Sequence, residues 1–224
     1  MGSDNLFHRR KAKQGKDLAR KKAMRASYAK ILIVCEGEKT EPNYFNELKD
    51  YLTLNSATVK VTGECESSPI SVFEYSLRLY KFAKNAGDSY DKVFCVFDKD
   101  THSSYQKTLQ NIESVKPKDS FAAITSTPCF EYWLMLHFTY TTRQFRGTGN
   151  SSSCDQLITE LKNYFPRYQK GDVSIFDKTK NYLPQAKSRA ARSLQEATNN
   201  MDDNPSTKVH LLIEYLENLS IEKA

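Results

Sequence analysis

The chain has 224 residues, 39% of them hydrophobic, and a formal net charge of +6. This length suits one domain with an appendage, and the composition supports a hydrophobic core, which excludes a chain that is disordered throughout. No apolar run is long enough to span a bilayer, and the charged N-terminus lacks the apolar segment of a secretory signal. We therefore expect a cytoplasmic protein without a membrane segment.

The charge is distributed unevenly along the chain. Residues 1–30 carry ten Lys or Arg against two Asp, whereas residues 31–224 have a net charge of −2. A basic arm on a slightly acidic body predicts an acidic partner such as nucleic acid, and the alternative is a solvated or disordered tail that aids solubility. The candidate contact residues of the arm are Arg9, Arg10, Lys11, Arg20, Lys21, Lys22 and Arg25.

Strand and helix patterns alternate up to residue 140. Continuous apolar runs predict buried strands at residues 31–35, 93–97 and 121–125, and alternating polarity predicts another strand within 57–65. Apolar residues at helical spacing predict helices over 40–52, 69–85, 103–115 and 127–138. This alternation predicts an α/β fold, in which a mostly parallel sheet is covered by helices on both faces.

The character of the sequence changes after residue 140. A Gly- and Ser-rich stretch at residues 147–153 predicts a flexible loop, and helical patterns follow at 152–164, 185–199 and 206–219. We therefore predict three parts: a basic arm (1–30), an α/β core (31–140) and a mostly helical region (141–224) that packs on the core.

The cysteine pattern bears on redox state and on zinc. The chain has five cysteines and no C-x-x-C motif. An odd, widely spaced set argues against a disulfide framework and against a structural zinc site, and it fits a reducing cytoplasm.

Acidic side chains directly follow two of the predicted strands. Glu36 comes after the first strand, and Asp98 and Asp100 come after the strand at 93–97. The carboxyl ends of parallel strands share one edge of a sheet, where ligands bind, so we expect these carboxylates to converge. Because clustered carboxylates repel, a hard cation such as Mg²⁺ or Mn²⁺ is predicted between them. The alternative is that they are loop acids that cap helices.

Further residues are candidates for the same site. Glu38 and Glu41 are near enough in sequence to join it, and Lys39 lies where a helix N-terminus favours phosphate. The alternative for all three is ordinary helix capping.

Glu131 lies in a strongly apolar segment, where an unpaired carboxylate is costly to bury. We expect it to bind metal or substrate, or else to serve a structural role. Ser126 lies close before it and is a candidate hydrogen-bond donor. Of the histidines, His102 lies closest to the predicted metal ligands, and Lys170 is expected to be a solvated surface charge.

Four segments carry a resemblance to a known family: ILIVCEGEKTEPNYF (31–45), VFDKD (96–100), STPCFEYWLMLHF (126–138) and NPSTKVHLLIEYL (204–216). Together with the basic arm they resemble the RloB family. The acidic pattern is similar to that of the Toprim domain of topoisomerases, primases and nucleases. The resemblance extends over nearly the whole chain and implies a Toprim-like fold. By position it implies that Glu36 is the general acid/base and that Asp98 and Asp100, with Glu36, bind metal.

Two classes of function follow from these observations. The resemblance implies a metal-dependent nuclease that acts on DNA or RNA, tRNA included, in bacterial antiviral defence or abortive infection, beside an ATPase-type partner. The alternative is a non-catalytic module that retains the fold and binds nucleic acid or docks on the ATPase. Both stay open here, as do the choice between DNA and RNA and the number of metals.

Overall fold

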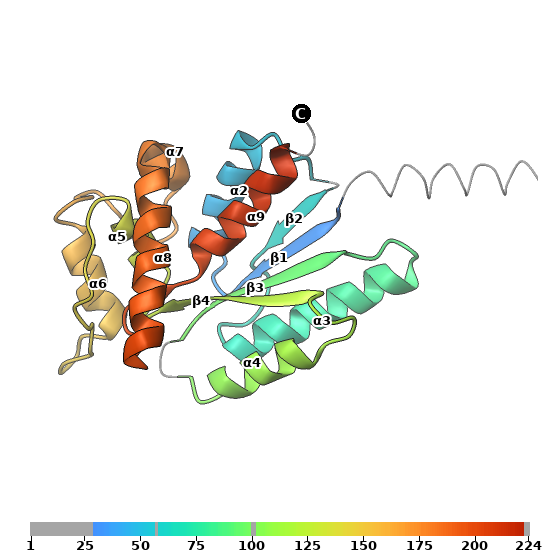
Figure 1. Cartoon of the computed structure of the whole chain (residues 1–224), viewed down its shortest axis with the longest axis horizontal. Coiled ribbons are helices and arrows are strands. Elements are labelled where there is room, and N and C mark those ends of the chain that lie inside the picture. The colour runs from blue at the N-terminus through green and yellow to red at the C-terminus, as the bar shows by residue number, and fades with distance from the viewer. Residues whose placement is uncertain (1–28, 57, 100–101, 222–224) are drawn as a thin grey trace, which may run out of the picture.

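A computed structural model of the chain describes residues 29–56, 58–99 and 102–221 (Figure 1). Asp100 and the seven candidate contact residues of the basic arm lie outside the described residues. Within the described part, no helix is both long and apolar enough to cross a membrane.

The fold is built on a five-stranded sheet with the order β2-β1-β3-β4-β5. The first four strands run parallel, and the fifth is antiparallel to β4. The strands are β1 (Ile31–Cys35), β2 (Val59–Thr62), β3 (Lys92–Asp98), β4 (Phe121–Thr127) and β5 (Ser206–Thr207). The four parallel strands confirm the three strands expected from apolar runs and the one expected from alternating polarity within 57–65.

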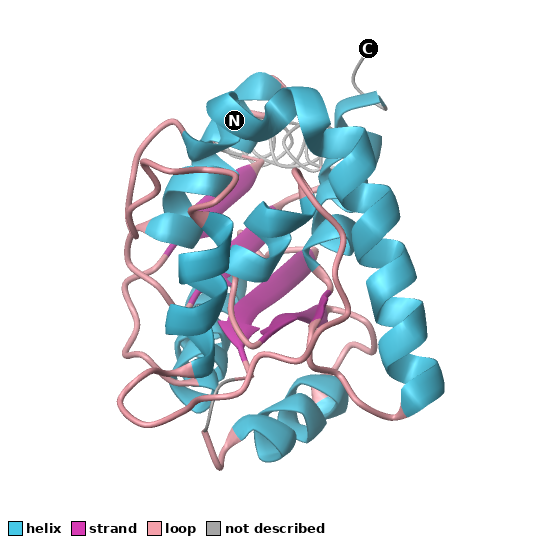
Figure 2. Ribbon diagram, turned by 90° about the vertical axis from the view of Figure 1, so that its left-hand side faces the viewer, coloured by secondary structure: helices cyan, strands magenta, loops and turns pink. Residues whose placement is uncertain are grey.

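Helices cover both faces of this sheet, as the second view shows (Figure 2). They are α2 (Thr40–Tyr51), α3 (Pro69–Asn85), α4 (Tyr105–Ser114), α5 (Glu131–Leu136), α6 (Ser153–Leu161), α7 (Ile175–Thr179), α8 (Leu183–Asn200) and α9 (Val209–Ile221), with a 3₁₀ turn at Lys180–Tyr182. The α/β fold with a C-terminal helical segment is therefore confirmed.

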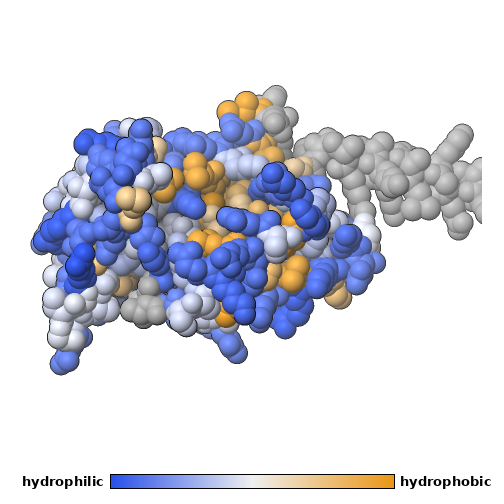
Figure 3. All heavy atoms as spheres, turned by 60° about the horizontal axis from the view of Figure 1, so that its bottom comes forward, coloured by the Kyte–Doolittle hydropathy of each residue, from blue (hydrophilic) through white to orange (hydrophobic). Residues whose placement is uncertain are grey.

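The alternation of side chains along the strands divides the core into two clusters. Leu32 and Val34 of β1 pack with α3 and α4, whereas Ile31 and Ile33 pack with α2, α5, α8 and α9. Adjacent residues of a strand point to opposite faces, so an uninterrupted apolar run fills both clusters. Seen from the side of α3 and α4, the surface is mainly hydrophilic, with scattered hydrophobic residues (Figure 3).

The chain after residue 140 is closely joined to the core. Phe145, Leu161, Ala190 and Leu212 belong to the same hydrophobic cluster as Ile31. Burial of apolar surface stabilises this contact, at roughly 25 cal/mol for each Å² removed from water. The domain boundary at residue 140 stays a prediction, and the larger hydrophobic cluster contains residues from both sides of it.

Two local predictions were wrong. The helix expected from residue 206 begins at Val209, because Ser206 and Thr207 pair with β4 as a short strand. The helix expected from residue 127 begins at Glu131, because residue 127 ends β4 and a turn follows it. The first error concerns a strand of two residues, which is too short to produce a periodic pattern.

The cysteine spacing argued against a disulfide framework, yet one pair of cysteines is bonded. Cys129 and Cys154 form a disulfide, with a Cα–Cα distance of 5.9 Å, although 25 residues separate them. The fold brings them together because Cys129 lies in the turn before α5 and Cys154 lies in the first turn of α6. Cys35, Cys65 and Cys95 are free.

Candidate metal and phosphate site

A cavity of about 410 Å³ opens at the carboxyl ends of β1 and β3. Five segments far apart in sequence meet there, and the acidic side chains outnumber the basic ones. The lining residues are Glu36, Gly37, Glu38, Lys39, Thr40, Glu41, Ser67, Asp98, His102, Phe130, Glu131, Lys170 and Gly171. We call this cavity the carboxylate pocket, after Glu36, Glu41, Asp98 and Glu131.

Glu36 joins the ends of the two central strands. Its backbone N–H extends the pairing of β1 with β3 by donating to Val96 O at 2.9 Å. Its side-chain Oε2 accepts a hydrogen bond from the Asp98 N–H at 3.0 Å, and its Oε1 lies 3.6 Å from His102 Nε2. The Glu36 carboxylate is therefore held in one orientation, with one oxygen bound to the backbone and the other beside an imidazole.

Glu41 lies in the first turn of α2 and is buried. Burial raises the pKa of its carboxyl group to about 7, and the charges of Glu131 and Glu36 act in the same direction. Gly37 makes this placement possible, because a Cβ at position 37 would lie 2.2 Å from Glu41 Oε2. A glycine after Glu36 is thus needed for the close approach of the second carboxylate.

Asp98 is the last residue of β3, and the same effects act on it more strongly. Burial raises the pKa of its carboxyl group well above the usual range, and the charges of Glu41, Glu131 and Glu36 raise it further. The backbone amide of Phe130 opposes this shift by a hydrogen bond that favours the charged form. The negative charges of the other three carboxylates thus all act on Asp98.

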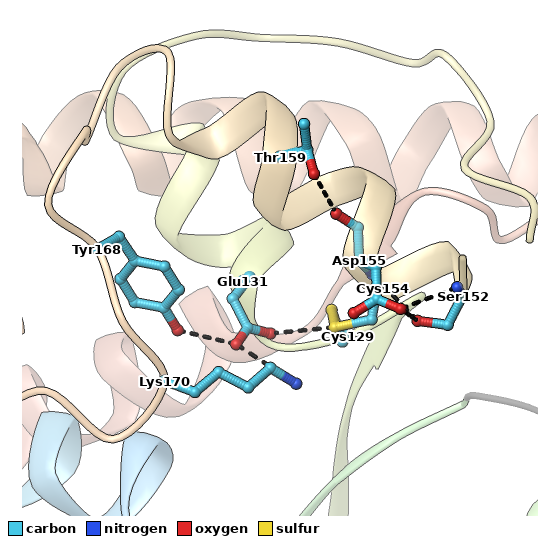
Figure 4. The surroundings of a disulfide bond; sticks show 8 residues. All are labelled: Cys129, Glu131, Ser152, Cys154, Asp155, Thr159, Tyr168 and Lys170. Carbon is cyan, nitrogen blue, oxygen red and sulfur yellow. Dashed lines mark hydrogen bonds and ion pairs between the residues drawn. A yellow bond between two sulfur atoms is a disulfide. The ribbon is translucent and has the colours of Figure 1, made fainter. Parts of the chain in front are cut away.

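Glu131 is the first residue of α5, and only 3% of its surface is exposed. Its Oε1 accepts a hydrogen bond from the Tyr168 hydroxyl at 2.8 Å and lies 3.8 Å from Lys170 Nζ (Figure 4). A buried carboxylate requires such partners, because an unpaired one pays a large desolvation penalty. The partners come from a turn nearly forty residues further along the chain.

The turn that carries Tyr168 and Lys170 is attached to the start of α2. The Gly171 N–H donates to Thr40 Oγ1 at 2.9 Å, and Asn43 Nδ2 donates to Gly171 O at 3.2 Å. Gly171 has a φ of +81°, a conformation that glycine adopts without steric strain. These contacts hold the turn that carries Lys170 beside the pocket, and 60% of the Lys170 side chain is exposed.

The remaining predicted residues fall in different places. Glu38 and Lys39 line the pocket and are exposed, and His102 lines it as well. Ser126 is paired with Asp98 across β3 and β4 but does not line the pocket, and its Oγ shares a hydrogen bond with Thr207 Oγ1 at 2.9 Å. Tyr168 was missed by sequence reasoning, and no pattern around it marks a contact with Glu131.

The donor set of the carboxylate pocket fits a hard divalent cation. Its four carboxylates offer oxygen ligands, and burial and neighbouring charges raise the pKa of Glu41 and of Asp98, which a nearby cation would oppose. In the described part of the chain, the only three acidic, histidine or cysteine side chains whose ligand atoms all lie within 4.8 Å of one another are Cys129, Glu131 and Cys154. Among the described residues, no three of the pocket carboxylates therefore lie close enough to bind one cation directly, so a bound Mg²⁺ would take one or two of them and complete its shell with water.

Fold and pocket together define an α/β protein with an acidic site at the carboxyl edge of a parallel sheet. The model of the RloB-like protein family matches residues 31–216, which include every residue that lines the carboxylate pocket. The chain therefore belongs to the RloB-like protein family, as the resemblance indicated. A comparison with curated proteins finds no match.

Proposed function

We propose that the protein is a Toprim-type nuclease that uses Mg²⁺ or Mn²⁺ to cleave phosphodiester bonds of DNA or RNA. The observation that supports this proposal is the carboxylate pocket, in which five acidic side chains from three separate segments meet at the carboxyl edge of the sheet, where ligands bind in such folds. Family membership adds the expectation of a role in bacterial antiviral defence beside an ATPase-type partner.

One or two of Asp98, Glu36, Glu41 and Glu131 would hold the cation directly, and water would complete its shell. Asp98 and Glu41 are the strongest candidates, because burial raises the pKa of both carboxyl groups and a neighbouring cation would oppose that shift. When bound, a divalent cation lowers the pKa of a water ligand and stabilises charge on phosphate oxygens.

Glu36 is the residue best placed to move a proton. Its Oε2 is occupied by the Asp98 N–H, so Oε1 is the atom that would accept a proton from the attacking water. His102 Nε2 lies 3.6 Å from that oxygen, and the His102 side chain is 35% exposed, which would give the proton a route to solvent. General-base catalysis of this kind contributes about 10²–10⁴-fold to a rate.

Cationic groups at the rim of the pocket would bind the substrate. Lys170 and Lys39 both line the pocket, and the N-terminus of α2 favours anions there. The basic arm would add contacts to the phosphate backbone outside the site, with an affinity that falls as salt rises.

The test is cleavage of DNA and of tRNA by the full chain with Mg²⁺ or Mn²⁺, with and without the ATPase-type partner. Asp98→Asn and Glu36→Gln are expected to lower the cleavage rate at least 10²-fold. Glu113→Gln, on the exposed side of α4, is the matched control and should cleave like the native protein. Undiminished cleavage by Asp98→Asn would overturn the proposal.

A further inference from the structure

The disulfide lies beside the carboxylate pocket. Cys129 precedes Glu131 by two residues, and Cys154 stands in the first turn of α6, which packs against α5. Figure 4 shows the Cys154 sulfur directed toward the Glu131 carboxylate, with Tyr168 and Lys170 on the opposite side. Both sulfurs therefore lie near an acidic residue of the pocket.

The two oxygens of Glu131 have different surroundings. Oε1 contacts the Tyr168 hydroxyl and the Lys170 ammonium group, and Oε2 lies 3.6 Å from Cys154 Sγ. A disulfide sulfur carries no proton, so in the oxidised form it cannot donate to Oε2. A reduced Cys154 has an S–H group at the same place and can donate a hydrogen bond to that oxygen.

The bonded pair also differs from Cys35 and Cys95 in burial. Cys35 and Cys95 are fully buried, and burial raises the pKa of the Cys95 thiol to about 12 and of Cys35 well above its usual range. Cys129 is buried and Cys154 is half-buried, so Cys154 is the more exposed residue of the pair. Exchange with a small thiol would therefore begin at Cys154.

We propose that Cys129 and Cys154 form a reversible dithiol–disulfide site that controls the availability of Glu131 in the carboxylate pocket. The oxidised form leaves Glu131 Oε2 free to bind a cation. In the reduced form the Cys154 thiol donates to that oxygen and competes with the cation. The effect on metal binding rests on the proposed function, whereas the redox chemistry of the pair does not.

Monothiols of the glutathione class are the exchange partner. A thiolate attacks Cys154 Sγ, the S–S bond breaks, and Cys129 leaves as a thiolate and takes up a proton. A second thiolate attacks the mixed disulfide, which releases Cys154 as a thiol and forms the disulfide of the small thiol. Two electrons and two protons pass to the protein, and the reverse sequence restores the bond.

The test begins with the full-length chain equilibrated in glutathione buffers of fixed thiol-to-disulfide ratio. After an acid quench, free thiols are alkylated and the peptides that contain Cys129 and Cys154 are quantified by mass spectrometry. Both sulfurs should change together and reversibly with the ratio, while Cys35 and Cys95 stay reduced. A pair that is alkylated at every ratio would overturn the proposal.

The second measurement is the affinity for Mn²⁺ of each form after gel filtration removes glutathione. Reduction should weaken binding by about fivefold, the usual effect of one competing hydrogen bond. Cys129→Ala combined with Cys154→Ala should abolish this redox dependence, and Cys65→Ala, which leaves the pair intact, should retain it.

The outcomes separate the two proposals. Equal Mn²⁺ affinity in both forms would overturn the control of Glu131 and leave the metal site standing. Absence of Mn²⁺ binding in both forms, with a pair that oxidises and reduces normally, would overturn the metal site and support the redox site alone.

Discussion

Burial of the Glu41 carboxyl group in the carboxylate pocket lowers the stability of the folded protein above pH 7, and Glu41→Gln tests this directly. Folding raises the Glu41 pKa from 4.5 to about 7, so above pH 7 the folded state holds a carboxylate that it disfavours by about 3 kcal/mol. Because this pKa is raised, its contribution to stability is fully present below pH 4.5 and is lost as the pH rises through about 7. Glutamine has the same shape and no charge.

The assay is urea unfolding in EDTA at pH 4.5 and at pH 8.5. At pH 8.5, Glu41→Gln should raise the free energy of unfolding by about 3 kcal/mol, which corresponds to a rise of roughly 6–12 °C in Tm for a chain of this size. At pH 4.5 the gain should vanish. Glu113→Gln, exposed on α4, should stay within about 0.5 kcal/mol of the native protein at both pH values. A Glu41→Gln protein that is no more stable at pH 8.5 would refute the electrostatic reasoning.

Three further predictions follow from the same geometry. Mn²⁺ affinity should rise about tenfold from pH 6 to pH 8, because Glu41 has a pKa of about 7 and must be ionised to bind the cation. Calorimetric titration at both pH values measures this change. Tyr168→Phe should lower the free energy of unfolding by about 2 kcal/mol, because it removes a hydrogen bond to the buried Glu131 carboxylate. Urea unfolding measures this, with the exposed Tyr164→Phe as control, and an unchanged free energy would mean that the hydrogen bond does not stabilise the fold. Gly37→Ala should weaken Mn²⁺ binding at least tenfold, since its Cβ would displace the Glu41 carboxylate, and unchanged affinity would exclude Glu41 as a ligand.

The sequence predicted the parallel sheet well because β1 and β3 are buried on both faces. Such strands have continuous apolar sequences, and an acidic residue follows the apolar run of each strand. The meeting of Glu36 with Asp98 then follows from the topology, because parallel neighbours end at one edge. The local sequence pattern and the general topology of parallel sheets are thus enough to predict the contact between Glu36 and Asp98.

The other half depends on contacts that no local pattern encodes. Tyr168 and Lys170 reach Glu131 through a turn that is attached to α2, and the sequence around them reads as an ordinary polar loop. Lys170, expected to be a solvated surface charge, is largely exposed yet lies at the pocket. The apolar setting of Glu131 did signal a need for partners, because a carboxylate there must be paired, but it did not identify them.

The disulfide could not be predicted for a related reason. Cysteine spacing indicates pairing only when a framework of several bonds constrains a small domain, and here a single bond joins a turn and a helix within a larger core. Only the packing of α6 against α5 brings the two sulfurs together.

The central claim is that the carboxylate pocket binds the divalent cation that cleavage requires. The most direct measurement is a titration of Mn²⁺ into the oxidised full-length chain at pH 8, compared with Asp98→Asn and the Glu113→Gln control. The native protein and the control should bind Mn²⁺ alike, and Asp98→Asn should lose at least tenfold in affinity. Equal binding by all three proteins would contradict the claim.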